Sequence, residues 1–224
     1  MRLTVILPFF NEEALLPDLP ATLDAIRAAL SKHDVEILAV DDGSTDKTAD
    51  GLAALDGVRV ETHPENRGVG AAMNTGLNMA EGEAAIVFDA DAPYPPETLA
   101  ELVDALEHAD VSTLSPYHPD GEVEGVGAFR LLLSKGASML YRRKLKSDLH
   151  TFTCAVRAYR LPQAKALLPA PDDFTAAAYL MARALQTGLR VVEVPAVLRA
   201  RAAGSSKMRV GSTIRSHLRL LARL

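Results

Sequence analysis

The 224-residue chain is predicted to fold as a single α/β domain, with a mostly parallel sheet covered by helices on both faces. Short apolar segments alternate with segments of helical periodicity from residue 3 to about residue 115, which is typical of a doubly wound sheet. The apolar segments are nearly continuous, as in VEILAV (35–40), which indicates strands buried on both faces. The length allows one substantial core and is short for two enzyme domains.

The elements of the first half follow from their periodicity and flanking residues. Helices are expected where apolar residues recur three or four positions apart, as Leu15, Leu19 and Leu23 do. Ser44 or Thr45 is expected to cap the second helix. The predicted strands span residues 3–8, 35–40, 58–62, 83–88 and 111–114, and the predicted helices span residues 13–31, 45–55, 68–81 and 96–108.

The second half is less regular. Helices are predicted over residues 129–144 and 174–187, a strand over 190–194, and a loop over 202–209. Residues 212–224 are predicted to form an amphipathic helix, with Ile214, Leu218 and Leu221 on one side and Arg215 and Arg219 on another. We therefore expect one domain over residues 1–210, followed by a basic amphipathic segment over residues 211–224.

Charge is distributed unevenly along the chain. The net charge is −5, yet residues 196–224 contain seven Lys and Arg residues and no acid, so the rest of the chain carries −12. An acidic body with a basic tail predicts an anionic partner near the C-terminus. Nucleic acid is not the expected partner, because aromatic residues make up only 5% of the sequence and none lies between these basic residues.

The remaining composition indicates a globular intracellular protein. Hydrophobic residues make up 48% and charged residues 24% of the chain. Cys154 is the one cysteine, so no internal disulfide can form, which fits a reducing compartment. No apolar run approaches the roughly 18 residues of a membrane span, and the one after Met1 is too short for a signal peptide. A cytoplasmic location is therefore expected.

Three polar clusters follow predicted strands at their carboxyl ends, where the strands of a parallel sheet direct side chains into one crevice. Asp89 and Asp91 directly follow a buried strand, and two such carboxylates repel each other unless a cation or a proton intervenes. Mg²⁺ or Mn²⁺, which take oxygen ligands and bridge phosphates, are the expected cations, and a solvated pair of loop residues is the alternative. The clusters are PFFNE (8–12), DDGS (41–44) and DAD (89–91).

The order of these clusters resembles glycosyltransferase family 2, the inverting GT-A transferases. The resemblance is closest to the branch of dolichyl-phosphate and polyprenyl-phosphate mannose or glucose synthases, and it covers almost the whole chain. It implies a GT-A, Rossmann-like fold. The segments that carry it are LPFFNEE (7–13), EILAVDDGSTDKTA (36–49), ENRGVGAAMNTGLNMAEGE (65–83), FDADAPYPPE (88–97), VRAYR (156–160) and GLRVVEVPAVLRARAAGSSKM (188–208).

The resemblance implies that Pro8, Phe10, Glu12 and Asp42 hold the nucleoside of a nucleotide-sugar donor. A carboxylate such as Asp42 accepts a hydrogen bond from a ring N–H of uracil or guanine, so a GDP-sugar and a UDP-sugar both stay open. Asn74, on the following helix, is expected mainly to satisfy backbone groups.

The resemblance also implies that Asp89 and Asp91 bind the metal and, through it, the donor diphosphate, with Asp91 taking part in catalysis. A metal there is a Lewis acid that offsets charge on the departing nucleoside diphosphate. Arg67 and Gly68 are expected to line the donor side.

Residues 199–207 resemble the family's lid over the donor. Arg201 and Lys207, together with Arg199, are the cations that would neutralise the diphosphate, and Gly204 would supply a hinge. The alternative is a solvated basic loop.

For the acceptor, the resemblance implies that Arg130 and Ser134 grip a lipid phosphate. They lie four residues apart and therefore share one helix face. Without the resemblance, a solvated Arg and a small packing Ser explain this pair nearly as well. Arg157 is a further candidate for phosphate contact.

The sequence departs from the lipid-phosphate branch at three places, one of which is Val69, where Lys is common. Pro93 stands where a glutamine usually helps to coordinate the metal. Ser115-Pro116-Tyr117 stands where Ser-Arg-Tyr is usual, and the following His118 is a possible substitute cation. These changes weaken the assignment of the acceptor and of the sugar, but they do not erase the donor and metal motifs.

One absence favours a phosphate acceptor. FTAAAYLMARAL (174–185) carries no acid where many family members that act on hydroxyl acceptors have their catalytic base. A hydroxyl nucleophile needs a general base, whereas a phosphate is already ionised near neutral pH. Asp172 and Asp173 lie just upstream and would supply a base in a shifted alignment.

We therefore expect a metal-dependent hexosyltransferase that moves a sugar, with inversion, from a GDP- or UDP-sugar to a polyprenyl or dolichyl phosphate. The basic amphipathic segment is expected to hold it at the cytoplasmic face of an anionic membrane. One alternative is a family 2 transferase acting on a sugar or lipid hydroxyl. The other is a degenerate nucleotide-sugar-binding protein, which Pro93 and Pro116 would support.

Overall fold

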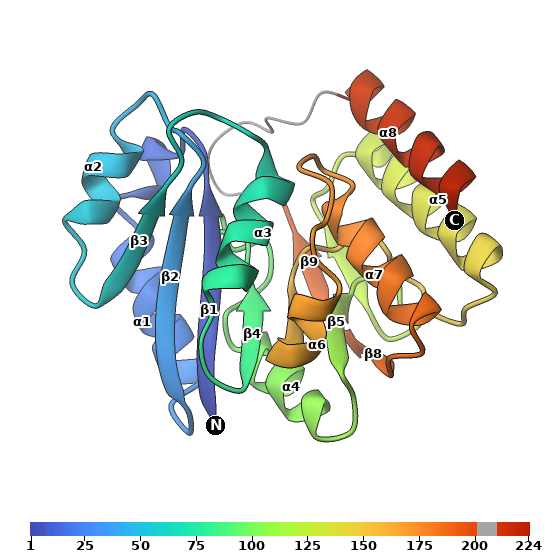
Figure 1. Cartoon of the computed structure of the whole chain (residues 1–224), viewed down its shortest axis with the longest axis horizontal. Coiled ribbons are helices and arrows are strands. Elements are labelled where there is room, and N and C mark those ends of the chain that lie inside the picture. Colours follow the sequence, from blue (N-terminus) through green and yellow to red (C-terminus); the bar gives the residue numbers. More distant parts are fainter. Residues whose placement is uncertain (201–209) are drawn as a thin grey trace.

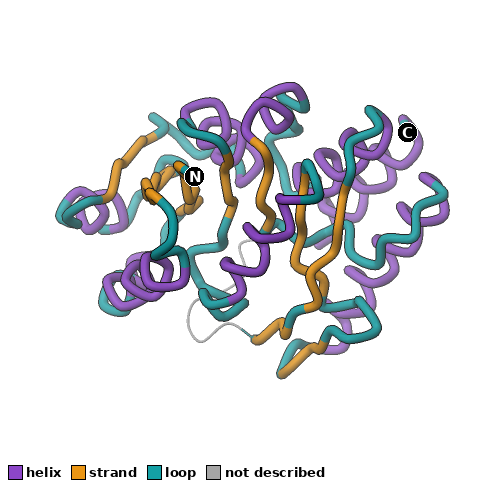
Figure 2. Tube along the Cα trace, turned by 90° about the horizontal axis from the view of Figure 1, so that it is seen from below, coloured by secondary structure: helices purple, strands orange, loops and turns teal. Residues whose placement is uncertain are grey.

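A computed structural model describes residues 1–200 and 210–224. Within these ranges a seven-stranded sheet forms the middle layer and helices cover both of its faces (Figures 1 and 2). Along the sheet the strand order is β3-β2-β1-β4-β7-β5-β8, and every strand except β7 runs in the same direction. The predicted fold class, a mostly parallel sheet between two helical layers, is therefore confirmed.

The predicted strands are all present, with small shifts at their ends. Three further strands were not predicted: β7 in the main sheet, and β6 and β9, which pair with each other in a separate two-stranded sheet. The strands are β1 (Arg2–Phe9), β2 (Asp34–Asp41), β3 (Val58–Thr62), β4 (Ala84–Val87), β5 (Val111–Ser115), β6 (Glu122–Glu124), β7 (Arg157–Arg160), β8 (Val191–Pro195) and β9 (Val197–Arg199).

The helices match most of the predicted ranges, and α6 was not predicted. The α-helices are α1 (Leu19–Ala29), α2 (Thr48–Ala53), α3 (Val69–Met79), α4 (Thr98–Asp104), α5 (Ala128–Leu145), α6 (Leu161–Ala166), α7 (Ala176–Gln186) and α8 (Val210–Arg223). Short 3₁₀ helices span Glu13–Leu15 (η1) and Ala105–Glu107 (η2). In the described part of the chain, no helix has both the length and the apolar character needed to cross a bilayer.

Two predicted helices start later than expected. Residues 13–31 do not form one helix, because Pro17 lacks a backbone N–H donor, and α1 begins only after it. The helix predicted from Thr45 begins at Thr48, and the predicted caps are wrong. Ser44 Oγ instead accepts a hydrogen bond from the Asn11 N–H at 2.8 Å, and the Thr45 N–H donates to Asn11 Oδ1 at 2.7 Å. Both residues are therefore used to join the loops after β1 and β2.

Arg157 is part of the core of the protein. It lies on β7, the central antiparallel strand, and its side chain is 0% exposed. The guanidinium donates to Thr113 Oγ1 at 3.1 Å, to the Phe152 carbonyl at 2.8 Å and to the Ala177 carbonyl. The expectation that Arg157 contacts a phosphate is wrong, because the fold uses these donors to tie β5, β7 and α7 together.

The core has one part on each face of the sheet and a third at its edge. Side chains of α1, α2 and α4 pack on one face, and those of α3, α6 and α7 pack on the other. The third part lies between α5, α7 and α8, where Tyr141, Phe152 and Met181 surround Leu220. Leu220 is the buried residue of α8, and burying a leucine contributes about 1.5–3 kcal/mol. Leu221 and Leu224 pack beside it, and Tyr141 Oη lies 2.9 Å from His217 Nδ1, so α8 is attached to α5 and α7 by packing and by a hydrogen bond.

Candidate active site

Two cavities open at the edge of the sheet where β1, β2 and β4 end. The smaller has a volume of about 200 Å³ and is lined by the loops after these strands. The larger, of about 830 Å³, extends from the loop after β4 to α5 and α8. Four residues line both cavities, namely Val69, Asp89, Asp91 and Phe174. The carboxylates predicted to bind a metal therefore lie where the cavities meet.

The smaller cavity gathers the residues expected to hold a nucleoside. Pro8, Phe10 and Glu12 come from the end of β1 and its loop, Asp42 follows β2, and Gly68 precedes α3. They meet because the parallel strands β1 and β2 pair in register up to Phe9 and Asp41, which brings their following loops side by side.

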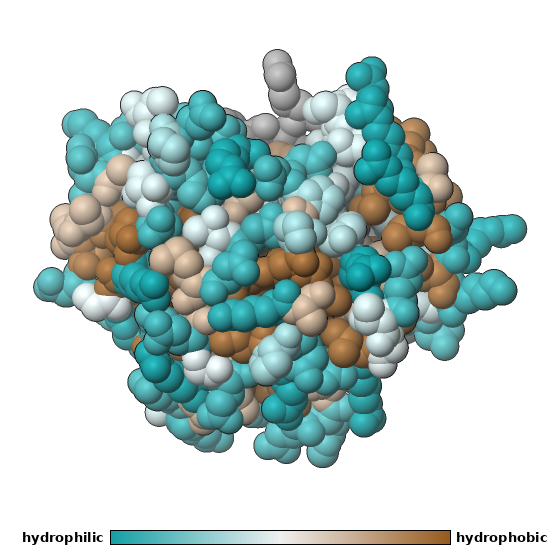
Figure 3. Space-filling model, in the orientation of Figure 1, coloured by the Kyte–Doolittle hydropathy of each residue, from teal (hydrophilic) through white to brown (hydrophobic). Residues whose placement is uncertain are grey.

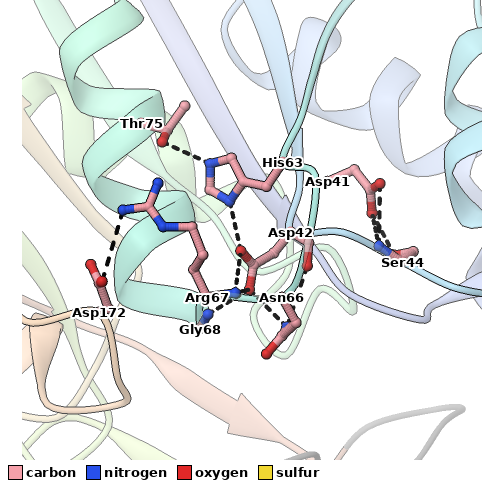
Figure 4. A network of polar contacts seen from close by, with 9 residues as sticks. All are labelled: Asp41, Asp42, Ser44, His63, Asn66, Arg67, Gly68, Thr75 and Asp172. Atoms are coloured by element: carbon pink, nitrogen blue, oxygen red, sulfur yellow. Dashed lines mark hydrogen bonds and ion pairs between the residues drawn. The ribbon is translucent and has the colours of Figure 1, made fainter.

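Asp42 is the centre of a hydrogen-bond network (Figure 4). One carboxylate oxygen accepts from His63 Nδ1 at 2.7 Å, and the other accepts from Asn66 Nδ2 at 2.8 Å and from the Gly68 N–H at 2.7 Å. The Arg67 N–H also points at this carboxylate, at 3.1 Å. Asp42 is 2% exposed. Its carboxylate therefore holds the 63–68 loop in place and shapes the wall of the smaller cavity.

Sequence reasoning missed His63, which anchors this network from the other side. Its second ring nitrogen, Nε2, lies 2.8 Å from Thr75 Oγ1 on α3, so the imidazole joins β2 to α3 through Asp42. A usable signal existed, because His63 directly follows a predicted strand at its carboxyl end, as the three recognised clusters do.

The first turn of α3 packs against another segment of the chain, residues 171–172. The Gly70 N–H donates to the Asp172 carbonyl at 2.8 Å. Gly68 has φ +114°, and a Cβ there would lie 2.3 Å from the same carbonyl oxygen. A Cβ on Gly70 would lie 2.0 Å from the Pro171 carbonyl oxygen. Glycine is therefore required at both positions for α3 to dock against residues 171–172.

Arg67 and Asn74 have partners in the protein. The Arg67 guanidinium lies 3.8 Å from the Asp172 carboxylate and points away from Asp42, and Arg67 is not among the residues that line either cavity (Figure 4). Arg67 therefore contributes to the donor side only through its backbone N–H, which belongs to the Asp42 network. Asn74 exchanges two hydrogen bonds of 2.8 Å with the backbone of Ala170, which confirms that it satisfies backbone groups.

Asp89 and Asp91 fit a hard divalent cation. Both residues line both cavities, and Ala92 after them has φ +43°, a strained turn of the kind found at ligand sites. Within residues 1–200 and 210–224, no group of three or more His, Cys, Asp or Glu residues is arranged to hold a metal. Mg²⁺ commonly takes one or two carboxylates and completes its shell with water and substrate phosphates, so a pair suffices.

The larger cavity contains the predicted pair on α5. Arg130 and Ser134 line it together with Tyr117, and Ser134 Oγ lies 2.7 Å from Thr153 Oγ1. Burial raises the pKa of the Tyr117 phenol, although the hydrogen bond with Ser134 and the charge of Arg130 oppose this rise. The phenol thus stays protonated and adds a hydroxyl to this polar end. Sequence reasoning missed Tyr117 and Thr153 as site residues.

The rest of the larger cavity is apolar and open along α5 and α8. Exposed hydrophobic side chains gather on these two helices, which lie side by side at one edge of the molecule, where Figure 3 shows hydrophobic surface beside hydrophilic side chains. They are Phe129 (64% exposed), Leu132 (69%), Met139 (67%), Leu140, Ile214 and Leu218 (56%). All but Phe129 also line the cavity.

Three residues considered in the sequence line neither cavity. His118 packs edge-on against His150, with ring centroids 5.4 Å apart, and does not replace a cation in the cavity wall. Asp172 pairs with Arg67. Asp173 accepts hydrogen bonds from the backbone and hydroxyl of Thr175. Burial alone would raise the pKa of Asp173, but the hydrogen bonds from Thr175 and Ser216 and the charge interaction with His217 outweigh burial and lower it.

Two predicted lid cations, Arg201 and Lys207, lie outside the described residues, as does the loop predicted over 202–209. Arg199 is described and lines the larger cavity.

Solved structures with a similar architecture define the class of fold. Glucosyl-3-phosphoglycerate synthase from Mycobacterium tuberculosis, in complex with phosphoglyceric acid, superposes with a TM-score of 0.75 at 21% identity, covering 98% of this chain and 78% of that chain. The same enzyme in complex with Mn²⁺, uridine diphosphate and phosphoglyceric acid gives a TM-score of 0.73 at 20% identity, covering 99% and 76%. The fold is thus that of a GT-A glycosyltransferase.

Sequence comparison assigns the family. The model of glycosyl transferase family 2 matches residues 4–167, and the chain belongs to this family. The polyprenol monophosphomannose synthase of Mycolicibacterium smegmatis is 38% identical, covering 96% of this chain and 83% of the relative. The undecaprenyl-phosphate mannosyltransferase of Micrococcus luteus is 33% identical, covering 94% and 89%. The dolichol-phosphate mannosyltransferase of Pyrococcus furiosus is 32% identical over 100% of this chain, which spans 64% of that relative.

The Asp42 network predicts a specific defect for Asp42→Asn. The amide would place N–H groups against one or more of the donors that now point at the carboxylate, which should lower the free energy of unfolding by about 2–4 kcal/mol. Binding of GDP and UDP should weaken at least tenfold, because the 63–68 loop that lines the smaller cavity is released. Denaturant unfolding and calorimetry measure the two effects.

The matched control is Asp50→Asn, which removes the same charge from the partly exposed face of α2. It should leave unfolding within about 0.5 kcal/mol of the unmodified protein. Equal behaviour of the two variants would show that Asp42 does not organise the site.

Proposed function

We propose that the protein transfers a sugar from a GDP- or UDP-sugar to a polyprenyl phosphate, with inversion at the anomeric carbon. The observation that carries this proposal is the position of Asp89 and Asp91 in the shared wall of a smaller cavity, which contains Glu12 and Asp42, and a larger, mostly apolar one. Such a junction suits a reaction between a nucleotide-sugar diphosphate on one side and a lipid phosphate on the other.

The smaller cavity is assigned to the donor. Pro8, Phe10 and Glu12 surround the nucleoside, the Asp42 network fixes the opposite wall, and Asp89 and Asp91 hold the metal beside the diphosphate. A bound Mg²⁺ or Mn²⁺ offsets the negative charge that develops on the departing nucleoside diphosphate. The complexes of the mycobacterial synthase with uridine diphosphate and either Mn²⁺ or Mg²⁺ support this assignment by analogy of fold.

The larger cavity is assigned to the acceptor. Arg130, Ser134 and Tyr117 offer a guanidinium and two hydroxyls to a phosphate at its polar end. The apolar walls on α5 and α8 suit the first units of an isoprenoid chain. The names of the relatives, which describe transfer to dolichol, polyprenol or undecaprenyl phosphates, support the same acceptor class.

The reaction is a single displacement. A phosphate oxygen of the acceptor attacks the anomeric carbon from the face opposite the diphosphate, the new O–C bond forms, and the old C–O bond breaks with its electron pair going to the nucleoside diphosphate. No side chain needs to remove a proton, because the phosphate is already ionised. Asp91, at the junction, orients the donor for this attack.

Transfer to a hydroxyl acceptor has less support. Such a nucleophile needs a general base, and the nearest candidates, Asp172 and Asp173, line neither cavity. A degenerate binding protein would retain donor affinity without turnover, and the transfer assay below separates it from an enzyme.

We also propose that α5 and α8 hold the protein on the cytoplasmic face of an anionic membrane. Their exposed apolar side chains would enter the lipid interface, with basic residues beside them to meet anionic headgroups. These basic residues are Arg142, Arg143 and Lys144 at the end of α5, and Arg215, Arg219 and Arg223 on α8. A peripheral position of this kind would bring the acceptor chain to the open side of the larger cavity.

Purified protein with a GDP- or UDP-sugar, Mn²⁺ and a polyprenyl phosphate should form a polyprenyl-phosphate sugar. Asp89→Asn and Asp91→Asn should each lower kcat/KM at least 10²-fold, because the metal and diphosphate lose a charged ligand, which is worth about 2.7 kcal/mol or more of transition-state stabilisation. Radiolabelled sugar extracted into organic solvent gives the rate.

Asp104→Asn, on α4 away from both cavities, is the control and should keep full activity. The proposal is wrong if the sugar is transferred only to hydroxyl acceptors. Binding of donor without any transfer would instead indicate the degenerate binding protein.

The membrane contact predicts that the double variant Leu132→Glu/Leu218→Glu binds anionic vesicles at least tenfold more weakly. The variant loses two exposed apolar side chains on α5 and α8 and gains two negative charges, which anionic headgroups repel. Co-sedimentation with phosphatidylglycerol vesicles measures binding, and raising the salt concentration should weaken the unmodified protein as well.

Ala53→Glu, an exposed substitution on α2, is the matched control and should bind as the unmodified protein does. Unchanged vesicle binding by the double variant would rule out α5 and α8 as the contact.

A further inference from the structure

The sequence led us to expect Arg199 beside the donor diphosphate, yet Arg199 lines the larger cavity and not the smaller one that is assigned to the donor. It ends β9 and lines the cavity together with Asp89, Asp91 and Arg130. We propose that Arg199 is a second ligand of the acceptor phosphate, and that Glu124 holds its guanidinium until the acceptor binds. The inference rests on the proposed transfer to a polyprenyl phosphate and adds a specificity-determining residue to that site.

The backbone of Arg199 is fixed beside the loop that carries the metal carboxylates. Its N–H donates to the Pro93 carbonyl at 2.8 Å, two residues after Asp91. On its other side β9 pairs with β6, with Arg199 opposite Glu124, and the Ala200 N–H donates to the Glu124 carbonyl at 3.0 Å. The side chain thus starts from a rigid point close to where the two cavities meet.

The side chain itself is loosely tethered. Arg199 Nε lies 3.3 Å from a Glu124 carboxylate oxygen, and the two side chains are 57% and 56% exposed. An ion pair this exposed contributes little stability, because water screens it. A phosphate offers the guanidinium two parallel charge-assisted hydrogen bonds, which are shorter and stronger. Exchanging Glu124 for the phosphate is therefore favourable.

Charge balance in the cavity points to the same role. A phosphate monoester carries about −1.5 to −2 near neutral pH. Among the described residues of the cavity wall, the Arg and Lys side chains are Arg130 and Arg199, and the loop after β5 contributes the uncharged Pro116. Lys135 Nζ lies 5.4 Å from the centroid of the Tyr117 ring, but Lys135 is not a residue of the wall. Within the described wall Arg130 alone matches only part of the phosphate charge, and the nearby Asp89 and Asp91 add negative charge. Arg199 supplies the second positive charge.

The test is Arg199→Gln, which keeps a long polar side chain and removes the charge. The KM for polyprenyl phosphate at saturating donor should rise at least tenfold, while the KM for the nucleotide sugar stays within twofold. Calorimetry with farnesyl phosphate, in the absence of donor and metal, should show the same loss of affinity without relying on turnover.

Two further variants separate the proposed role from general effects. Glu124→Gln frees the guanidinium and should lower the KM for polyprenyl phosphate or leave it unchanged. Arg2→Gln breaks the Arg2–Glu81 pair, which is similarly exposed (50% and 54%) but lies at the start of β1, and should change neither KM. Melting temperatures of all three should match the unmodified protein.

The inference is overturned if Arg199→Gln raises the KM of the donor instead, which would place Arg199 on the diphosphate, or if it changes neither KM. Both outcomes leave transfer by the unmodified protein intact. Failure of the proposed function would appear differently, as absence of transfer to polyprenyl phosphate by the unmodified protein.

Discussion

The main constraint on the site is the negative charge of the two carboxylates that follow β4, which the other groups of the site must offset. Asp89 and Asp91 place negative charge in the wall shared by both cavities, and both proposed substrates bring more. The proposed metal offsets the charge on the donor side, and Arg130 and Arg199 offset it on the acceptor side. A third carboxylate, that of Asp42, needs no such cation, because hydrogen-bond donors from residues 63–68 surround it.

The fold holds these groups in place by backbone contacts more than by side-chain packing. The loops after β1 and β2 lie side by side because these strands pair in register. The start of α3 packs through Gly68 and Gly70 against residues 171–172, and the Arg199 N–H on β9 donates to the Pro93 carbonyl. The donor side is thus built on the rigid centre of the sheet. The acceptor side includes α8, which packs at the edge of the domain through Leu220 and the contact between Tyr141 and His217.

The sequence predicted what depends on local pattern. The parallel strands and the clusters at their ends were visible because apolar runs are followed directly by Asn, Asp or Glu. β7 was missed because it has four residues, two of them Arg, and only the surrounding fold explains why Arg157 is buried. The His63–Asp42 contact and the cavity between α5 and α8 join residues far apart in the chain. The local pattern placed His63 at the end of a strand, but it could not show which residue His63 contacts.

The most direct measurement is the melting temperature with GDP or UDP, in the presence of Mn²⁺ and in the presence of EDTA. A ligand at 100 times its Kd stabilises by about 2.7 kcal/mol, which for a chain of this size is a rise of about 5–10 °C. The account predicts such a rise for one nucleotide with Mn²⁺, and little change with EDTA or with Mn²⁺ alone. An equal rise in EDTA, or no rise with either nucleotide, would contradict a metal–diphosphate site at Asp89 and Asp91.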